Sequence, residues 1–170
     1  MRTIPNLAVS AALTLALVLM GAPAASAQAT KRVLTIEVAE KMALACEAYQ
    51  KSQKDWRTLN IAILDDAGDL LYFRRDPTSF RGSIKIAIDK AWTSTQFPMS
   101  TRDIGEKIVN REPGKIHGFQ FMERVISFPG GIPIFIAGQH AGAIGVSGAT
   151  GDQDEECALK AVDAVRDMLK

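Results

Sequence analysis

Two predicted β-hairpins constrain the fold of this chain more than any other feature. The first covers residues 59–73 and turns at 65–69, where Gly68 can take the positive φ that a tight turn needs. The second covers residues 132–147 and turns at 137–140. Glycines along its return strand indicate that another part of the chain packs closely against that backbone.

Helical segments are predicted before, between and after the hairpins. Apolar or small side chains recur at helical spacing in residues 35–51, 83–95 and 152–169, and a shorter helix is expected from about 101 to 110. Thr35 is placed to cap the first of these helices. The order helix, hairpin, helices, hairpin, helix indicates a single α+β domain, an antiparallel sheet flanked by helices.

The first 27 residues have the features of a secretory signal peptide rather than of a folded domain. Arg2 precedes an apolar run at residues 7–20, and the small residues 25–27 fit a signal-peptidase site. The run is shorter than the roughly 20 residues that span a bilayer; an uncleaved membrane anchor is the alternative. We therefore expect cleavage after residue 27, a mature domain at 28–170 without a membrane span, and a periplasmic or secreted location.

Charge and cysteine content narrow the range of functions. The chain has 20 basic and 19 acidic residues and a formal net charge of +1, so it lacks the broad positive field that binds nucleic acid. Its two cysteines, Cys46 and Cys157, lie on the apolar faces of the first and last predicted helices. In an oxidising compartment they could form a disulfide, and the alternative is two small hydrophobic residues in the core.

The sequence contains no standard catalytic motif and assigns no catalytic residue. Ser147 is a conceivable nucleophile, but no histidine or lysine lies near enough in sequence to be its evident partner. Histidine commonly binds haem iron, and the chain has two. His117 lies in a polar loop close to two phenylalanines, and His140 lies at the second hairpin turn. For both, the alternative is a solvated surface residue.

Cationic side chains form a second group of candidates. Arg74, Arg75 and Asp76 follow the first hairpin, and Lys90 lies in the next predicted helix. If the cations converge, they could hold carboxylates such as the propionates of haem, with bidentate hydrogen bonds in the case of arginine. The alternative is an ordinary set of solvated charges and salt bridges.

Motifs in four places, at residues 63–71, 82–93, 128–134 and 143–157, agree in order and spacing with a known family. Together they resemble the GlcG/HbpS family of haem-binding and haem-degrading proteins, over residues 34–169. The resemblance implies a profilin/PAS-like fold and assembly into homo-oligomers, octamers among them. One branch of that family is an extracellular haem and iron sensor accessory, and another is fused to cobalamin adenosyltransferases.

The resemblance also marks candidate ligand-binding residues. The positions that match the family motifs are Arg75, Asp76, Lys90, Thr93, Pro129, Gly130, Gly131, Ser147 and Gly148. We expect them to surround one pocket, in which the glycine backbone lets a flat cofactor such as haem approach closely. His117 is the candidate metal ligand, to the haem iron. The charged loop at 102–121 is longer than the family implies, and we expect it to carry specificity particular to this chain.

These expectations lead to one leading function and two alternatives. The leading function is an exported protein that binds haem or a similar planar or small-molecule ligand, and the resemblance implies haem degradation or sensing as its roles. The first alternative is an enzyme acting on a small organic acid or aldehyde, with Lys90 or Arg75 orienting the carboxylate. The second is an accessory partner of a periplasmic sensor or dehydrogenase. We expect a homo-oligomer and no nucleic-acid partner.

Overall fold

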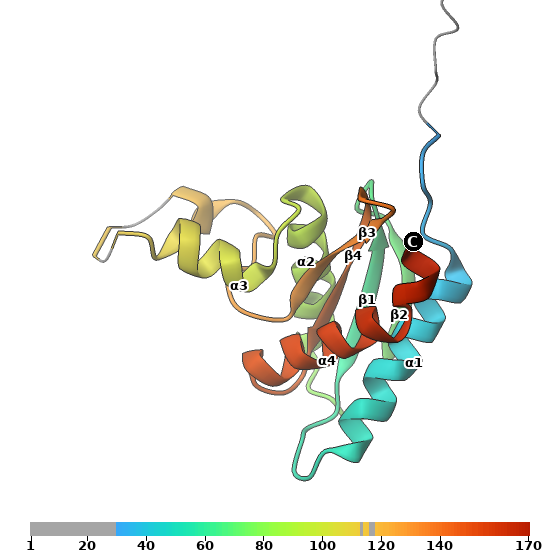
Figure 1. The fold of residues 1–170 in the computed structure, drawn as a ribbon. Coiled ribbons are helices and arrows are strands. Elements are labelled where there is room, and N and C mark those ends of the chain that lie inside the picture. Colours follow the sequence, from blue (N-terminus) through green and yellow to red (C-terminus); the bar gives the residue numbers. More distant parts are fainter. Residues whose placement is uncertain (1–29, 113, 116–117) are drawn as a thin grey trace, which may run out of the picture. The chain divides into compact units, whose positions relative to one another are not determined.

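A four-stranded antiparallel sheet forms the centre of the protein, as Figure 1 shows for this computed structural model. The spatial order of its strands is β2, β1, β4, β3, with bounds β1 (Asn60–Asp65), β2 (Leu70–Arg75), β3 (Gly131–Ile136) and β4 (Gln139–Ser147). Both predicted hairpins are present, and β1 pairs with β4 to join them. The structure describes residues 30–112, 114–115 and 118–170, so the expected signal peptide lies outside the described residues.

Helices cover both faces of this sheet (Figure 1). α1 (Ile36–Ser52) and α4 (Gly151–Ala164) pack together on one face, and α2 (Gly82–Gln96) packs on the other. Thr35 caps α1, as predicted, because its hydroxyl accepts a hydrogen bond from the Val38 amide. The predicted α+β architecture is confirmed. Within the described residues, no helix combines the length and the apolar character needed to cross a membrane.

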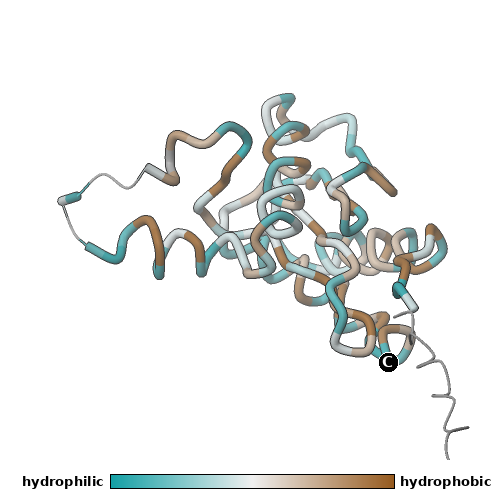
Figure 2. The backbone as a smooth tube through the Cα atoms, turned by 90° about the horizontal axis from the view of Figure 1, so that it is seen from above, coloured by the Kyte–Doolittle hydropathy of each residue, from teal (hydrophilic) through white to brown (hydrophobic). Residues whose placement is uncertain are grey.

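The chain between α2 and β3 forms an arm, by which we mean the described part of residues 101–128. The short helix predicted here is present as α3 (Thr101–Asp103), which continues into a π-helical segment, η1 (Ile104–Val109). The charged loop predicted at 102–121 is a loop only in part, because a 3-10 segment, η2 (Gly118–Phe121), also lies within it. Hydrophobic and hydrophilic residues alternate along the arm (Figure 2).

The last predicted helix ends earlier than expected. The pattern predicted a helix over 152–169, but α4 ends at Ala164, and a 3-10 segment, η3 (Arg166–Leu169), follows. At Val165 the backbone leaves helical geometry, with φ −116° and ψ 11°. Its amide then bonds to carbonyls only two and three residues earlier, which ends the α-helical hydrogen-bond ladder.

The two faces of the sheet are packed differently. The face toward α1 and α4 buries large aliphatic side chains such as Ile63 and Ile144, each contributing about 1.5–3 kcal/mol by its burial. The face toward α2 has smaller residues, with Ala62 of the sheet clustered with Ala87 and Ala91 of the helix. The small residues let α2 lie close to the sheet.

Gly145 on β4 explains this close approach. A Cβ atom at Gly145 would overlap the carbonyl oxygen of Ala87 and crowd the amide nitrogen of Ala91, so only glycine fits. The close packing predicted from the glycines of this strand is therefore confirmed, and the element that packs there is α2. Because it is held to β4, α2 crosses β4, β1 and β3 and leaves β2 largely uncovered on this side.

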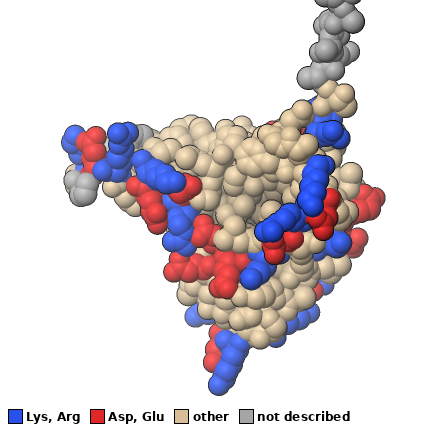
Figure 3. All heavy atoms as spheres, in the orientation of Figure 1, with Lys and Arg blue, Asp and Glu red and all other residues tan. Residues whose placement is uncertain are grey.

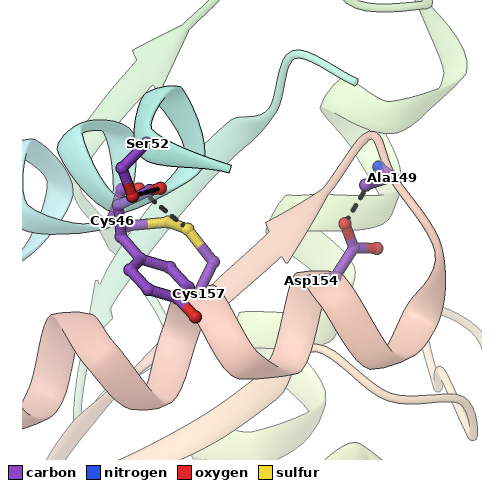
Figure 4. The surroundings of a disulfide bond; sticks show 6 residues. Cys46, Ser52, Ala149, Asp154 and Cys157 are labelled. Atoms are coloured by element: carbon purple, nitrogen blue, oxygen red, sulfur yellow. Dashed lines mark hydrogen bonds between the residues drawn. A yellow bond between two sulfur atoms is a disulfide. The ribbon is translucent and has the colours of Figure 1, made fainter. Parts of the chain in front are cut away.

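A disulfide bond joins the two helices on the opposite face (Figure 4). Cys46 of α1 and Cys157 of α4 are both fully buried, and their Cα atoms lie 5.0 Å apart. The structure thus decides between the two alternatives that the sequence left open. The bond joins residues separated by 111 positions in the chain, so it ties the first helix of the domain to the last.

Candidate functional site

Most of the predicted site residues lie at one end of the sheet, where β1 begins and β2 and β4 end. Asn60 opens β1 and pairs with Arg75 of β2 on one side and with Ser147 of β4 on the other. Since neighbouring strands lie about 4.8 Å apart, Arg75 and Ser147 stand about 10 Å apart across this end. Gly131, at the start of β3, pairs with Gly145 on β4. This end of the sheet is the candidate site.

Asn60 connects the polar groups at this end. Its side-chain amide donates to the Ser83 hydroxyl at 2.7 Å, and its side-chain oxygen accepts from the Asp76 amide at 3.2 Å. Ser83 donates in turn to the Phe80 carbonyl at 2.6 Å. The buried amide therefore has partners on α2 and on the loop before it, as buried polar groups require. Asn60 was not predicted from the sequence, although a polar residue at the head of an apolar strand was a visible signal.

Asp76, a predicted ligand contact, holds its own loop in place. One carboxylate oxygen accepts hydrogen bonds from the side chain and the backbone amide of Thr78, at 2.6 and 2.8 Å. These hydrogen bonds keep the pKa of Asp76 below its ordinary value, so the group is ionised at neutral pH. A fixed negative charge here disfavours a carboxylate ligand, and contact between Asp76 and a ligand stays a prediction.

Lys90 is fully buried and forms an ion pair with Asp154. Its Nζ donates to the Asp154 carboxylate at 2.8 Å and to the Val146 carbonyl at 2.9 Å, and it lies 5.0 Å from the centre of the Phe128 ring. Asp154 also accepts a hydrogen bond from the Ala149 amide at 3.0 Å (Figure 4). The pair therefore joins α2, β4 and α4 at the end of the sheet.

Burial disfavours the charged forms of both Lys90 and Asp154. Desolvation lowers the pKa of Lys90 and raises the pKa of Asp154, while the attraction between the two charges opposes both shifts. Because the ammonium is enclosed and paired, it does not reach a ligand at the surface in this structure. The geometry therefore favours a structural role for Lys90 over the predicted binding of a ligand carboxylate.

Thr93 fixes the end of the arm to α2. Its hydroxyl donates to the Asp89 carbonyl at 2.7 Å and accepts from the Ile126 amide at 2.9 Å. Arg124 adds an ion pair with the Asp89 carboxylate at 3.1 Å, and its guanidinium carbon lies 4.7 Å from the centre of the Trp92 ring. Thr93 was predicted as a ligand contact, but all three hydrogen-bonding partners of its hydroxyl, the Arg124 carbonyl at 3.1 Å included, are backbone groups.

The glycines at this end of the sheet make room for protein atoms. Gly130 has φ +126°, and a Cβ there would lie 2.6 Å from the Lys90 Nζ. A Cβ on Gly131 would meet the Lys90 carbonyl, and one on Gly148 would overlap the Thr58 carbonyl. Protein atoms fill the space beside these glycines in this structure, and close approach of a flat ligand to their backbone stays a prediction.

The structure brings only some of the predicted site residues close to one another. Ser147 is buried, and Pro129 lies against Gly151 at the start of α4. Arg75 and Asp76 lie apart from the Lys90 ion pair, at the end of the edge strand β2. The residues close to the ion pair are Gly130, Gly131 and Val146, together with the neighbouring Ser147 and Gly148. His117 lies outside the described residues, so its binding of haem iron stays a prediction.

A small cleft lies beside α1, at the same end of the sheet. It is lined by Glu47, Gln50, Leu59, Ile61, Arg74 and Asp76. Arg74 donates to Glu47 at 2.7 Å, and this hydrogen bond holds the pKa of Glu47 below its ordinary value. The cleft has room for about one water molecule, which is too little for a cofactor. Within the described ranges, no cluster of three or more histidine, cysteine or acidic side chains could hold a metal ion.

Charges of both signs are mixed on the face formed by α1 and α4 (Figure 3). Arg102 of α3 is one example, since it forms ion pairs with Asp152 and Glu155 near the start of α4, each at 2.5 Å. These acidic partners raise the pKa of Arg102 further above its ordinary value. This face therefore presents no large field of one sign to a partner.

Comparisons with known proteins find relatives across the folded part of the chain. Residues 34–163 match the model of a family described as "Haem degrading protein HbpS-like". An uncharacterised 15.0 kDa protein from the dhaT-dhaS intergenic region of Citrobacter freundii is 31% identical over 138 residues, which are 79% of this chain and 94% of the relative.

Solved structures share the fold. The crystal structure of Klebsiella pneumoniae protein ORFY superimposes with a TM-score of 0.74 at 28% identity, over 82% of this chain and 95% of that one. The crystal structure of a PduOC:heme complex superimposes with a TM-score of 0.68 at 24% identity, over 78% of this chain and 95% of that one.

Proposed function

The chain belongs to the HbpS-like family of haem-degrading proteins, and from this premise we propose that it is an exported protein that binds haem. The observation that carries the proposal is the family match over residues 34–163, nearly all of the folded unit at 31–170. A protein with the same fold has been crystallised as a haem complex, which supports the same ligand.

Two features support the export of this protein. The first is the buried disulfide between Cys46 and Cys157, because disulfides persist in oxidising compartments and are rare in the cytosol. The second is the signal-like sequence at 1–27. The proposal predicts that the protein recovered from the exported fraction begins at Gln28, which N-terminal sequencing checks.

Haem presents an apolar ring, propionates and an iron atom. The described residues offer partners for the ring and for the propionates. For the apolar ring there are half-buried side chains beside α2, among them Phe73 and Ile88. For the propionates there is the exposed guanidinium of Arg75, which forms no side-chain hydrogen bond or ion pair within the described part of the chain. Bound haem would supply a redox-active iron.

Histidine would be the residue to hold the haem iron, and the structure describes one imidazole. His140, on β4, has a buried Nε2 that lacks a hydrogen-bond partner among the described residues, and its ring centre lies 5.6 Å from that of Phe135. It stands at the opposite end of β4 from Ser147 and thus far from Arg75. His117 therefore stays the predicted iron ligand, with His140 as the competing candidate.

The test is a titration of residues 28–170 with haemin, followed by the Soret absorbance. We expect a saturable Soret shift at micromolar haemin that His117→Ala weakens and His140→Ala leaves unchanged, so that the two variants act as matched controls. If neither variant alters the spectrum, haem binding holds but histidine ligation is refuted. If no saturable change occurs with the wild-type protein, haem binding itself is refuted.

The proposal extends to the degradation of haem and to the assembly of this protein into an oligomer. We propose haem degradation as the activity, which ascorbate and oxygen added to the complex would reveal as loss of the Soret band faster than for free haemin. We also propose a homo-oligomer, with an octamer as one candidate, which light scattering would measure. The alternative enzyme acting on a small acid keeps only Arg75 of its two proposed carboxylate partners, because Lys90 already has its charge paired by Asp154.

A further inference from the structure

The position of α2 leaves one part of the sheet uncovered. α2 is held against β4 by the glycine and alanine residues described above, and it does not extend over the edge strand β2. In the pairing of β1 with β2, Phe73 lies opposite Ala62 and Arg75 lies opposite Asn60. Asn60 donates a hydrogen bond to α2, so this face of β2 is the α2 face. Phe73 and Arg75 therefore point to the same side as α2, beyond the edge of that helix.

Apolar side chains of α2 border the uncovered strand. Ile88 and Trp92 are half-buried and pack with Phe73 around the alanine cluster between helix and sheet. Ile84 lies one helical turn before Ile88 on the same side of α2 and is also half-buried. We call the surface made by Phe73, Arg75, Ile84 and Ile88 the β2–α2 face. This face is an apolar surface with a cationic side chain at one end.

The two ends of the β2–α2 face differ in whether the arginine there is free to bind a ligand. At the Trp92 end, Arg124 is committed to the Asp89 carboxylate and to the Trp92 ring. At the other end, Arg75 is exposed, and its guanidinium has no side-chain partner among the residues that the structure describes. A ligand that lies on Phe73 and Ile88 would therefore meet a free guanidinium at one edge only.

The size and charge of the surface favour a small ligand over a protein partner. From Ile84 to Trp92 the helix advances about 12 Å, so an apolar strip about one side chain wide covers on the order of 100 Å². A stable protein dimer buries about 800 Å² on each partner, which is far more than this strip provides. A flat apolar molecule with carboxylates at one edge matches both the apolar surface and the free guanidinium of Arg75 at its end.

We propose that the β2–α2 face is the haem site, with the porphyrin lying on Phe73, Ile84 and Ile88 and a propionate bound by Arg75. This inference rests on the proposed function, because haem binding itself comes from the family match. It places the ligand on the outer side of the sheet edge. The buried end that contains Lys90 and the glycines is then the scaffold that holds α2 in position.

The test compares haemin with haemin dimethyl ester, which has the same ring but no carboxylates. Arg75→Glu should weaken haemin binding about tenfold and leave binding of the dimethyl ester within about twofold, because only the propionate contact is lost. Ile88→Asp should weaken both ligands, since it places a charge under the ring. Arg166→Glu, at an exposed position on η3, is the matched control and should change neither.

A second readout uses the two tryptophans of the chain. Trp92 borders the β2–α2 face, whereas Trp56 packs against the core cluster on the opposite side of the sheet. Haem quenches a nearby indole, so the fluorescence of Trp56→Phe protein should be quenched more strongly than that of Trp92→Phe protein. This comparison does not depend on an ionic contact. It is made with variants whose circular dichroism spectra show an unchanged fold.

The outcomes separate this inference from the proposed function. If wild-type protein binds haemin but Arg75→Glu and Ile88→Asp both stay within twofold of it, the β2–α2 face is refuted as the site and haem binding stands. If Ile88→Asp instead lowers the sedimenting mass without changing haemin affinity, the surface belongs to a contact between copies, and the inference is overturned. If the wild-type protein binds no haemin, both proposals fail.

Discussion

Removal of the disulfide between Cys46 and Cys157 should destabilise the protein mainly by freeing its unfolded chain. The bond closes a loop of 111 residues. In the chain-entropy description the cross-link lowers the entropy of the unfolded state by about 16 cal/mol/K for a loop of this length, or about 5 kcal/mol at 25 °C. Typical domains are stable by only about 5–15 kcal/mol, so the effect would be a large share of the total.

The variant to make is Cys46→Ala with Cys157→Ala, compared with oxidised wild-type protein in urea unfolding. Alanine leaves no unpaired polar atom at two positions that are fully buried. We expect the free energy of unfolding to fall by about 3–5 kcal/mol. The dependence on urea should become steeper, because an unfolded chain without the cross-link exposes more surface. Wild-type protein that has been unfolded and refolded with reductant should behave like the variant.

Two results would contradict this reasoning. A loss below about 1 kcal/mol would mean that the unfolded chain is already compact without the bond. A large loss with an unchanged urea dependence and an altered near-ultraviolet spectrum would mean that the bond acts through native packing of α1 against α4, rather than through the unfolded state.

Three further predictions concern the packing and the charges of the fold. Lys90→Met should cost about 3–5 kcal/mol in urea unfolding, because it leaves the buried carboxylate of Asp154 without its partner, and Lys90→Met combined with Asp154→Leu should recover part of that loss. Gly145→Ala should cost about 2–3 kcal/mol or more, because its Cβ would overlap backbone of α2, and a neutral outcome would refute the close approach. The hydrogen bond from Arg74 lowers the pKa of Glu47, so its stabilisation is present above pH 4.5, the ordinary pKa, and is lost as pH falls through the lower folded value. Glu47→Gln should therefore flatten the decline of the urea midpoint below pH 4.5, and an unchanged decline would contradict the assignment.

Local sequence was enough to predict the elements and their class. The turn at Gly68 and the alternating strands around it predicted the first hairpin, and Thr35 was correctly expected to cap α1. These features depend on neighbours within a few residues, and backbone conformation at that range is controlled by steric and capping preferences that the residue types carry. The end of α4 at Ala164 was one exception, since the apolar pattern continued beyond it, and the 3-10 segment η2 was another.

The roles of the candidate residues depended on contacts between distant parts of the chain. Lys90 was identified as important from its motif, but its partner Asp154 is 64 residues away, and the pair is buried by elements from both faces of the sheet. The glycine motif was likewise visible, but not whether ligand or protein would occupy the space beside Gly130. Sequence spacing cannot supply these answers, because burial and partner geometry arise only when the layers pack.

The sequence by itself therefore determined the antiparallel α+β class, the presence of both hairpins and the family to which the chain belongs. The tertiary structure decided which charged side chains are paired within the protein and which remain free. It paired Cys46 with Cys157, enclosed Lys90 and left Arg75 exposed beside an uncovered strand. The physical reason is that elements form through local preferences, whereas desolvation and ion pairing depend on the position of every other element around a side chain.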